Sequence, residues 1–405
     1  MSERFDGLVI GGGPGGSTAA ALLARAGWSV AVIEKASFPR RKVCGEFISA
    51  TNRPLFEQLG LAETFLDKAG PEIKRVGLFT GAAKLVAPMA ATHRLHTECG
   101  RALGRESLDT LLLDTARGAG ARVWQPWMAT SLVKQNGEYV CQIVSKDAGK
   151  PQELRARFVI AAHGSWEPGH LPTQIPRSKA CSSDLFGFKA RFVNASLPVD
   201  LMPLLVFPGG YGGLVQSDGG RLSFSCCVRR SQLERLRTQW ASTSAVDAVL
   251  RHIKETCVGV LEVLSDACLD GAGLSVGPIR PGIRRSPDDG IFLVGNAAGE
   301  AHPIVAEGIS MAMQSAWVLC RRLIGEREQI LSGHRLRQVR LGYEREWRRC
   351  FAPRLRAAAF FARVALHPAS AHLSRVLLER FPAVLSWGAR RSGKGRQIIE
   401  PAPSF

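Results

Sequence analysis

Three glycines near the start of the chain have the spacing that brings a backbone close to a diphosphate. Gly11, Gly13 and Gly16 follow an apolar run and fill the pattern G-x-G-x-x-G, with Pro14 and Gly15 between them. The first glycine permits a tight turn, the second lets the backbone approach phosphate oxygens, and the third lets a helix pack closely on the sheet. The N–H groups and positive dipole end of that helix favour an anion. The pattern therefore predicts a dinucleotide-binding turn.

An acidic residue follows at the place where a ribose would be recognised. Glu34 ends the apolar run 30–33, eighteen residues after the last glycine of the turn. A carboxylate at the end of the second strand can accept hydrogen bonds from ribose hydroxyls. Arg40, Arg41 and Lys42, in the basic stretch that comes next, could pair with the diphosphate or with an acidic substrate, or they could simply be solvated. Lys35, directly after Glu34, is a further candidate for binding the cofactor. These residues extend the prediction from a phosphate turn to a site for an adenine dinucleotide.

The elements that position these residues do not continue as regular strand–helix repeats. Alternating and buried apolar patterns predict strands within 73–100, from 123 onward, at 131–134, 140–146, 153–160, within 186–228 and at 291–294. Helical spacing and stop signals predict helices near 52–59, 105–116, 245–257, 308–323 and within 330–390. Asn136 and Gly137 mark a hairpin in the middle of the chain. The strands fall into two groups that alternate along the sequence.

Composition and charge restrict the class of protein. The chain has 405 residues and a net charge of +18, and residues 321–405 hold 18 Lys and Arg against 6 Glu, which leaves +12. This excess predicts an acidic partner or an anionic membrane surface. Nucleic acid is a further anionic partner, but the sequence has no nucleic-acid-binding motif that would favour it. The ten cysteines show neither C-x-x-C nor zinc spacing, so we predict no metal site. A polar N-terminus without an apolar signal region predicts a cytoplasmic protein.

Four segments together resemble one family. They are Gly11-x-Gly13-x-x-Gly16 with Glu34; Arg105-x-x-x-Asp109; Ala162-His163-Gly164; and Gly295-Asn296 with His302-Pro303 and Glu307-Gly308. In this combination the chain resembles the class A flavin monooxygenases of the para-hydroxybenzoate hydroxylase superfamily, and within it the branch of geranylgeranyl reductases and flavin halogenases. The resemblance covers residues 5–325 and implies FAD as the cofactor.

The fold implied is α/β and two-lobed, with a Rossmann-type FAD-binding domain interleaved with a β-sheet substrate domain. We predict the FAD-binding domain in 1–75, 100–175 and 278–325, and the substrate domain in 76–99 and 176–277. Residues 326–405 are predicted to form a C-terminal cationic helical region. Aromatic residues in 186–228 alternate with small or polar ones, which predicts an aromatic sheet face that could floor a substrate pocket. They are Phe186, Phe188, Phe192, Phe207, Tyr211 and Phe224.

The resemblance also implies roles for individual residues. Arg105 would face the flavin, Gly295 and Asn296 the ribityl chain, and Pro303, Gly308 and Ile309 the wall and helix N-terminus beside the ring. Cys44 and Gly45 match a Cys-Gly loop that approaches the flavin. The candidates for catalysis are Cys44, Glu46 and His302.

Two positions depart from the family pattern. Asn296 replaces an aspartate, and its amide oxygen can still accept a hydrogen bond. His163 replaces the other aspartate, a position often linked to nicotinamide binding. Electrons could therefore come from NAD(P)H or from a separate reductase.

Three reactions follow from this resemblance and from the charge. The first is hydroxylation of an aromatic or other electron-rich small molecule through a flavin C4a-hydroperoxide. The second is saturation of C=C bonds in an isoprenoid or lipid, which fits the Cys44 loop and the cationic amphipathic region 326–405 with its possible membrane-surface contact. The third is oxidation of a side chain of an acidic partner polypeptide. The W-x-W-x-I-P segment of the halogenases is missing from the sequence, which argues against halogenation.

Overall fold

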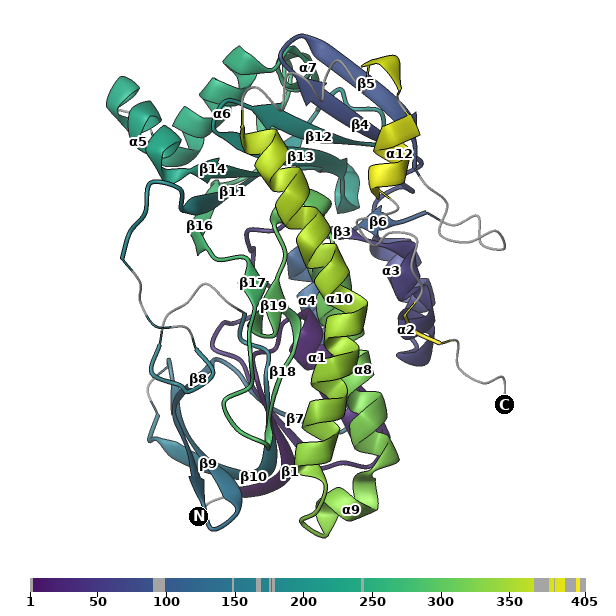
Figure 1. The fold of residues 1–405 in the computed structure, drawn as a ribbon, viewed down its shortest axis with the longest axis vertical. Coiled ribbons are helices and arrows are strands. Elements are labelled where there is room, and N and C mark those ends of the chain that lie inside the picture. The colour runs from purple at the N-terminus through teal and green to yellow at the C-terminus, as the bar shows by residue number, and fades with distance from the viewer. Residues whose placement is uncertain are drawn as a thin grey trace.

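The computed structural model places two β-sheets toward opposite ends of an elongated molecule, and the long helix α10 (Leu336–Leu366) runs alongside both (Figure 1). The structure describes residues 3–89, 99–147, 149–164, 169–174, 176, 179–241, 244–367, 379–381, 383–389 and 398–400. Parts of the predicted segments 76–99, 100–175, 176–277 and 326–405 lie outside these residues. The expected α/β architecture, with a Rossmann-type unit and C-terminal helices, is confirmed.

The strands are β1 (Glu3–Ile10), β2 (Val30–Ile33), β3 (Phe47–Ile48), β4 (Arg75–Thr80), β5 (Ala83–Pro88), β6 (Arg101–Ala102), β7 (Arg122–Trp124), β8 (Trp127–Gln135), β9 (Glu138–Ser145), β10 (Gln152–Ala161), β11 (Leu185–Val193), β12 (Leu201–Phe207), β13 (Gly210–Gln216), β14 (Leu222–Arg229), β15 (Cys268–Leu269), β16 (Leu274–Ile279), β17 (Gly282–Ile283), β18 (Ile291–Leu293) and β19 (Gly299–Glu300).

The helices are α1 (Pro14–Arg25), α2 (Arg53–Gln58), α3 (Ala62–Lys68), α4 (Arg105–Gly118), α5 (Arg230–Gln239), α6 (Ala245–Thr256), α7 (Val258–Val263), α8 (Gly308–Gly325), α9 (Arg327–Leu331), α10 and α12 (Ala383–Ala389). Short 3-10 turns lie at Ala50–Asn52, Asp218–Gly220, Gly295–Ala297 and Pro303–Val305. No helix among the described residues is both long and apolar enough to cross a bilayer.

The first sheet has the strand order β7-β2-β1-β10-β9-β8, with β18 also paired to β10. Strands β7, β2, β1, β10 and β18 are parallel to their neighbours, and β8 and β9 form the predicted antiparallel meander with β10. The parallel strands carry continuous apolar runs, and these runs are buried within this unit. Their carboxyl ends bring the glycine turn after β1 beside residues 162–164 after β10.

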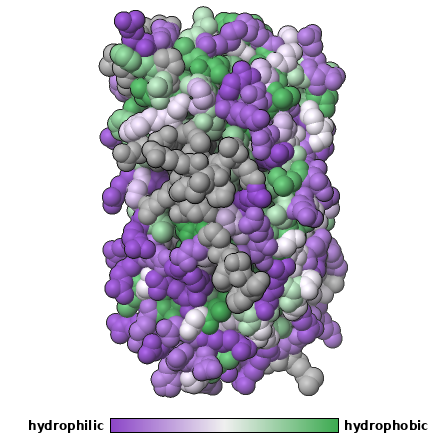
Figure 2. Space-filling model, turned by 90° about the vertical axis from the view of Figure 1, so that its right-hand side faces the viewer, coloured by the Kyte–Doolittle hydropathy of each residue, from purple (hydrophilic) through white to green (hydrophobic). Residues whose placement is uncertain are grey.

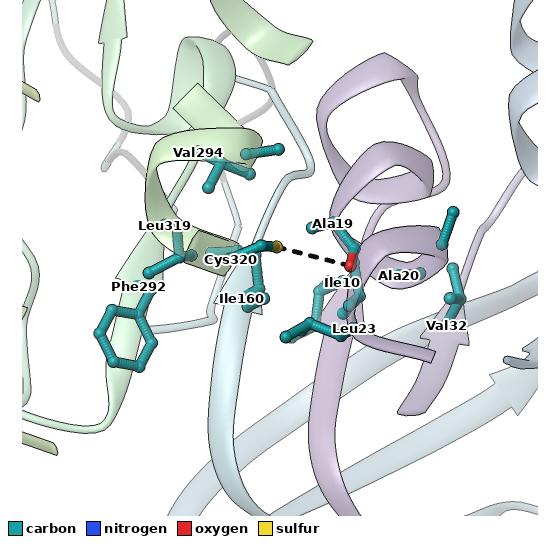
Figure 3. Packing of buried hydrophobic residues seen from close by; sticks show 14 of the residues in the cluster. Ile10, Ala19, Ala20, Leu23, Val32, Ile160, Phe292, Val294, Leu319 and Cys320 are labelled. Carbon is teal, nitrogen blue, oxygen red and sulfur yellow. Dashed lines mark hydrogen bonds between the residues drawn. The ribbon is translucent and has the colours of Figure 1, made fainter. Parts of the chain in front are cut away.

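Small residues let the helices of this unit approach closely. Ala19 and Ala20 of α1 are fully buried, and the Cys320 thiol of α8 contacts the Ala19 carbonyl oxygen at 3.6 Å (Figure 3). Ile10 of β1 and Ile160 of β10 lie beneath this contact. A side chain larger than alanine on α1 would push α8 away, and α8 begins at the predicted flavin site.

The second sheet has the order β15-β11-β14-β13-β12-β4-β5, with β16 also paired to β11. One face packs against α5, α6 and α7, and it contains Phe192, Phe207 and Phe224. The prediction that this aromatic face floors the pocket is therefore wrong for these residues. Because side chains alternate between faces along a strand, the opposite face carries Gly187, Lys189, Tyr211, Ser225 and Cys227. The division of the chain into domains by residue number remains a prediction.

Candidate active site

The glycine turn has a backbone that other residues cannot adopt. Gly11 has a φ of +107°, and a Cβ there would lie 2.6 Å from the Ala162 carbonyl oxygen. A Cβ on Gly16 would lie 1.9 Å from the carbonyl oxygen of Gly11. Gly13 is the N-cap residue of α1 and lines a large cavity together with Pro14 and Gly15. Because a glycine cap has no side chain over the first helical N–H groups, these donors face the cavity and suit a diphosphate.

Glu34 is buried at the end of β2 and holds the turn in place. Its two carboxylate oxygens accept hydrogen bonds from the N–H groups of Gly12 at 2.7 Å and Ala36 at 2.8 Å. A carboxylate has about four acceptor positions, so it retains capacity for ribose hydroxyls. Glu34 therefore fits the role predicted from the sequence.

The basic residues near the turn separate into two groups. Lys42 lines the cavity, and burial together with Arg105 and Arg40 lowers its pKa to about 7. Arg41 points elsewhere, because its guanidinium donates to the Ala272 carbonyl at 3.0 Å. Burial also lowers the pKa of Lys35, which is half-buried beside Glu34. The structure thus brings Lys42, one of the three basic residues considered for the diphosphate, to the cavity wall.

Arg105, the first residue of α4, also lines the cavity. Its guanidinium makes two hydrogen bonds of 2.7 Å to the carboxylate of Asp109, one turn further along the helix. Arg40 lies 3.7 Å from the same carboxylate. The bidentate pair holds the guanidinium plane in one orientation. Arg105 is therefore fixed at the position that the family resemblance predicted.

The loop with Cys44, Gly45 and Glu46 lies between the two sheets and lines the cavity. Glu46 has a φ of +64° and is buried, and its carboxylate lies 2.8 Å from the ammonium nitrogen of Lys189 on β11. Lys189 also donates to the Cys44 carbonyl at 3.0 Å and to the Ser223 hydroxyl. Burial lowers the pKa of Lys189, and the Glu46 charge opposes this shift. Lys189 therefore ties the loop to the second sheet.

Lys189 is a functional residue that the sequence prediction missed. The sequence could have indicated it, because a lysine stands among Phe186, Phe188 and Ala190 in a segment predicted to be a strand. A lysine at such a position needs a partner. That partner is 143 positions away, which the sequence pattern does not reveal.

Asn296 lies in the turn after β18 and lines the cavity. Gly295 has a φ of +59° and donates its N–H to the Ser315 hydroxyl at 2.8 Å. The Asn296 amide nitrogen donates to Glu300 at 3.1 Å. This contact assigns the amide orientation, so the amide oxygen is the remaining acceptor and can take a ribityl hydroxyl.

His302 pairs with a tyrosine from the second sheet. Its Nδ1 and the Tyr211 hydroxyl share a hydrogen bond of 3.3 Å, and both residues line the cavity. Burial lowers the pKa of His302 and, with Cys227, raises the pKa of Tyr211 well above its ordinary value. The pair is therefore neutral near pH 7 and holds a phenolic proton at the cavity wall. The sequence prediction placed Tyr211 on an aromatic face that could floor the pocket; Tyr211 does line the cavity, but on the face opposite Phe192, Phe207 and Phe224.

The helix N-terminus predicted beside the flavin begins at Gly308. Pro303 to Val305 form a 3-10 turn, Ala306 has a φ of +52°, and α8 follows. Pro303, Gly308 and Ile309 all line the cavity. The first N–H groups of α8 therefore point toward the same space as those of α1, and a helix dipole there stabilises negative charge.

His163, at the place of the family's usual aspartate, is neutral. Its two ring nitrogens lie 3.0 Å from the Gly164 carbonyl and 2.9 Å from the Thr173 hydroxyl. Burial lowers its pKa to about 4. Because the Gly164 carbonyl can only accept, Nδ1 carries the proton and Nε2 accepts from Thr173. The position thus presents no charge to a nicotinamide cofactor.

The cavity is lined by the glycine turn, Lys42, Arg105, the loop with Cys44 to Glu46, Asn296, Tyr211, His302 and the start of α8, and it has a volume of about 570 Å³. Its polar part lies at the glycine turn, Lys42, Arg105 and Asn296. The remaining wall is mainly apolar and comes from the second sheet, α10 and α12, and it includes Leu78, Val206, Ile279, Phe361, Val364 and Leu385. Helix N-termini for a diphosphate, acceptors for a ribose and a ribityl chain, and an apolar extension fit FAD with a substrate beside it.

Known proteins support this identification of the cofactor. The model of the FAD binding domain family matches residues 4–199. A digeranylgeranylglycerophospholipid reductase of Methanopyrus kandleri is 26% identical over 374 residues, which cover 89% of this chain and 87% of that protein.

Two solved structures show the same fold. A myxobacterial chondrochloren halogenase has a TM-score of 0.72 at 21% identity and covers 86% of this chain and 80% of its own. A geranylgeranyl bacteriochlorophyll reductase-like protein of Thermoplasma acidophilum has a TM-score of 0.69 at 20% identity, with 99% and 94% covered.

The fold and site define a flavoprotein of the class A superfamily. Residues 4–199 match the FAD binding domain family, the chain is similar to geranylgeranyl reductases and flavin halogenases, and it is an FAD-dependent oxidoreductase.

Proposed function

We propose that this protein is an FAD-dependent reductase that saturates C=C bonds of an isoprenoid or other apolar lipid chain. The observation that carries the proposal is the apolar part of the cavity, whose wall includes Leu78, Val206 and Ile279 of the second sheet and residues of α10 and α12. Such a wall buries a hydrocarbon chain favourably but offers few partners to a polar substrate. The Methanopyrus relative, a digeranylgeranylglycerophospholipid reductase, supports the same substrate class.

The chain's own residues would hold the cofactor along the polar part of the cavity. The N-terminus of α1 would bind the diphosphate with Lys42 nearby, Glu34 the ribose, and Asn296 the ribityl chain. The N-terminus of α8 would lie beside the isoalloxazine. When bound, FAD supplies the hydride that a C=C bond accepts.

Saturation of a C=C bond also needs a proton, and the Tyr211–His302 pair is placed to supply it. One alkene carbon gains a hydride and the other gains a proton, so a donor must reach the cavity. The Tyr211 hydroxyl remains protonated because burial raises its pKa. After Tyr211 has given its proton to the alkene, His302, which is hydrogen-bonded to it, would pass a proton from solvent back to the phenolate oxygen.

Cys44 and Glu46 take different roles in this proposal. Cys44 lines the cavity and would contact the flavin or substrate. Glu46 is bound to Lys189 at 2.8 Å and is better suited to hold the loop than to transfer a proton. Lys189 is thus a positioning residue for Cys44.

An anaerobic single turnover tests the proposal. The purified FAD-loaded protein, reduced by dithionite that is then removed, is mixed with a geranylgeranyl-bearing glycerophospholipid without oxygen. We expect a product with two added hydrogens for each reduced bond, seen by mass spectrometry. A product that gains oxygen, formed only in air, would instead support the hydroxylation expected first from the sequence.

Other expectations from the sequence, on the substrate, the electron donor and the location, remain predictions. If the protein oxidises an acidic partner polypeptide, its turnover should depend on the presence of that polypeptide. The electron donor, NAD(P)H or a separate reductase, and the cytoplasmic location are likewise to be tested.

A further inference from the structure

The apolar part of the cavity opens at a surface formed by α10 and α12. Phe360 of α10 and Trp387 of α12 line the cavity, yet their exposed fractions are 64% and 53%. Val384 lines it too and is exposed. Leu385, next along α12, instead packs inward against the cluster that contains Ala362 and Ala365. A side chain that belongs both to the cavity wall and to the outer surface marks the mouth of the cavity. We call Phe360, Val384 and Trp387 the apolar rim.

Positive charge surrounds the apolar rim. Arg356, Phe360 and Arg363 are exposed and stand one turn apart on α10, so they share one face of the helix. Neither arginine forms an ion pair with any residue that the structure describes. Arg380 is exposed near α12. Residues 354–396 contain nine Lys and Arg and one Glu. In Figure 2, the face that carries α12 shows apolar and hydrophilic residues intermixed toward its upper end.

We propose that this surface docks on an anionic lipid bilayer, so that the cavity mouth faces the acyl region. This inference rests on the proposed function for its purpose, since a membrane-borne substrate chain would then pass directly into the cavity. Aromatic side chains favour the interface between headgroups and hydrocarbon, and flanking arginines favour anionic headgroups. α12 packs on β4 and β5, and the Ser386 hydroxyl donates to the Pro88 carbonyl at 2.7 Å, so the rim has a folded support.

Charge and apolar contact make separate contributions that experiment can distinguish. Each basic side chain near an anionic surface raises the partition coefficient by roughly fivefold at low salt. This part weakens as salt screens the charges. The aromatic part is insensitive to salt, because it comes from apolar area removed from water.

Co-sedimentation of the FAD-loaded protein with vesicles tests the docking surface without any turnover. We expect binding to vesicles of phosphatidylcholine with phosphatidylglycerol and much weaker binding to phosphatidylcholine alone. Phe360→Ser with Trp387→Ser, and separately Arg356→Glu with Arg363→Glu, should each lower the partition coefficient at least about tenfold.

Matched controls lie on the other end of the same helix. Leu341→Ser removes an exposed apolar side chain, and Arg337→Glu with Arg345→Glu makes the same change of net charge at about 28 Å and about 16 Å from Arg356 along α10. Both should bind vesicles as the unchanged protein does, and retained FAD absorbance shows that each variant is folded.

Three results would overturn the docking surface. The first is the absence of binding to anionic vesicles. The second is an equal loss of vesicle binding in the control variants. The third is binding to polyglutamate that competes with vesicle binding and that Phe360→Ser with Trp387→Ser leaves unchanged. The last would point to an acidic polypeptide. Vesicle binding without C=C reduction would retain the docking surface and reject the reductase.

Discussion

Replacing Lys189 by methionine tests whether the buried ion pair holds the Cys44 loop to the second sheet. Lys189 and Glu46 are only 2% and 3% exposed, and their charged atoms lie 2.8 Å apart. Removing one partner of such a pair leaves a buried charge without its counter-ion and costs about 3–5 kcal/mol. Lys189→Met should therefore lower the free energy of unfolding by that amount, measured by urea denaturation with tryptophan fluorescence.

The double variant Lys189→Met with Glu46→Gln separates the charge from the packing. Because the amide carries no charge, the double variant should be more stable than Lys189→Met alone, and the cycle should show an interaction energy of at least ~1 kcal/mol. Lys84→Met is the matched control, since Lys84 and Glu262 form an exposed pair with side chains 44% and 53% exposed. It should change stability by less than about 1 kcal/mol. A loss for Lys189→Met no larger than for Lys84→Met would refute the reasoning.

Three further predictions concern cofactor binding and proton transfer. Gly16→Ala should abolish FAD retention, because the new Cβ would lie 1.9 Å from the Gly11 carbonyl oxygen. The control Gly118→Ala should retain FAD, because the space around Gly118 is open. FAD retention is read from the visible absorbance of the purified protein. The affinity for FAD should fall up to roughly tenfold from about pH 6 to about pH 8, because Lys42, with a pKa near 7, is increasingly neutral and a neutral amine does not attract the diphosphate. Isothermal titration should show this dependence, and Lys42→Met should flatten it; the same slope in that variant would exclude Lys42. Tyr211→Phe should slow reduction of the lipid by roughly 100-fold or more with FAD affinity unchanged, and an unchanged rate would exclude Tyr211 as the proton donor.

The cofactor site could be predicted from the sequence because its parts are local. The glycine turn, Glu34 and the Gly295-Asn296 turn each lie within a few residues of the strand end that positions them. Backbone conformation, such as the positive φ of Gly11, restricts residue type strongly enough to leave a mark in the sequence. Arg105 could also be singled out from the sequence, because its partner Asp109 is one helical turn away.

The substrate side of the site could not be predicted, because its contacts join distant segments. Lys189 meets Glu46, and Tyr211 meets His302, only once the second sheet has its register and packs against the segments that carry Glu46 and His302. The aromatic alternation in 186–228 predicted one buried face but did not say which face meets the helices. Phe192 lies on the face that packs against α5–α7, and Lys189 lies on the opposite face by alternation, where it meets Glu46.

The C-terminal region could likewise be predicted only in part from the sequence. Its cationic amphipathic character was visible in the sequence, but the place of Phe360 and Trp387 at the cavity mouth was not. An exposed aromatic residue and a buried one look alike in a periodic pattern. The docking proposal thus depends on the structure, whereas the expectation of a charged surface does not.

The measurement that most directly tests the central claim is anaerobic stopped-flow mixing of the reduced, FAD-loaded protein with a geranylgeranyl-bearing glycerophospholipid and, separately, with its fully saturated counterpart. The account predicts that the visible flavin absorbance returns with the unsaturated lipid and stays bleached with the saturated one. Absorbance that returns with neither lipid until oxygen is admitted would contradict it.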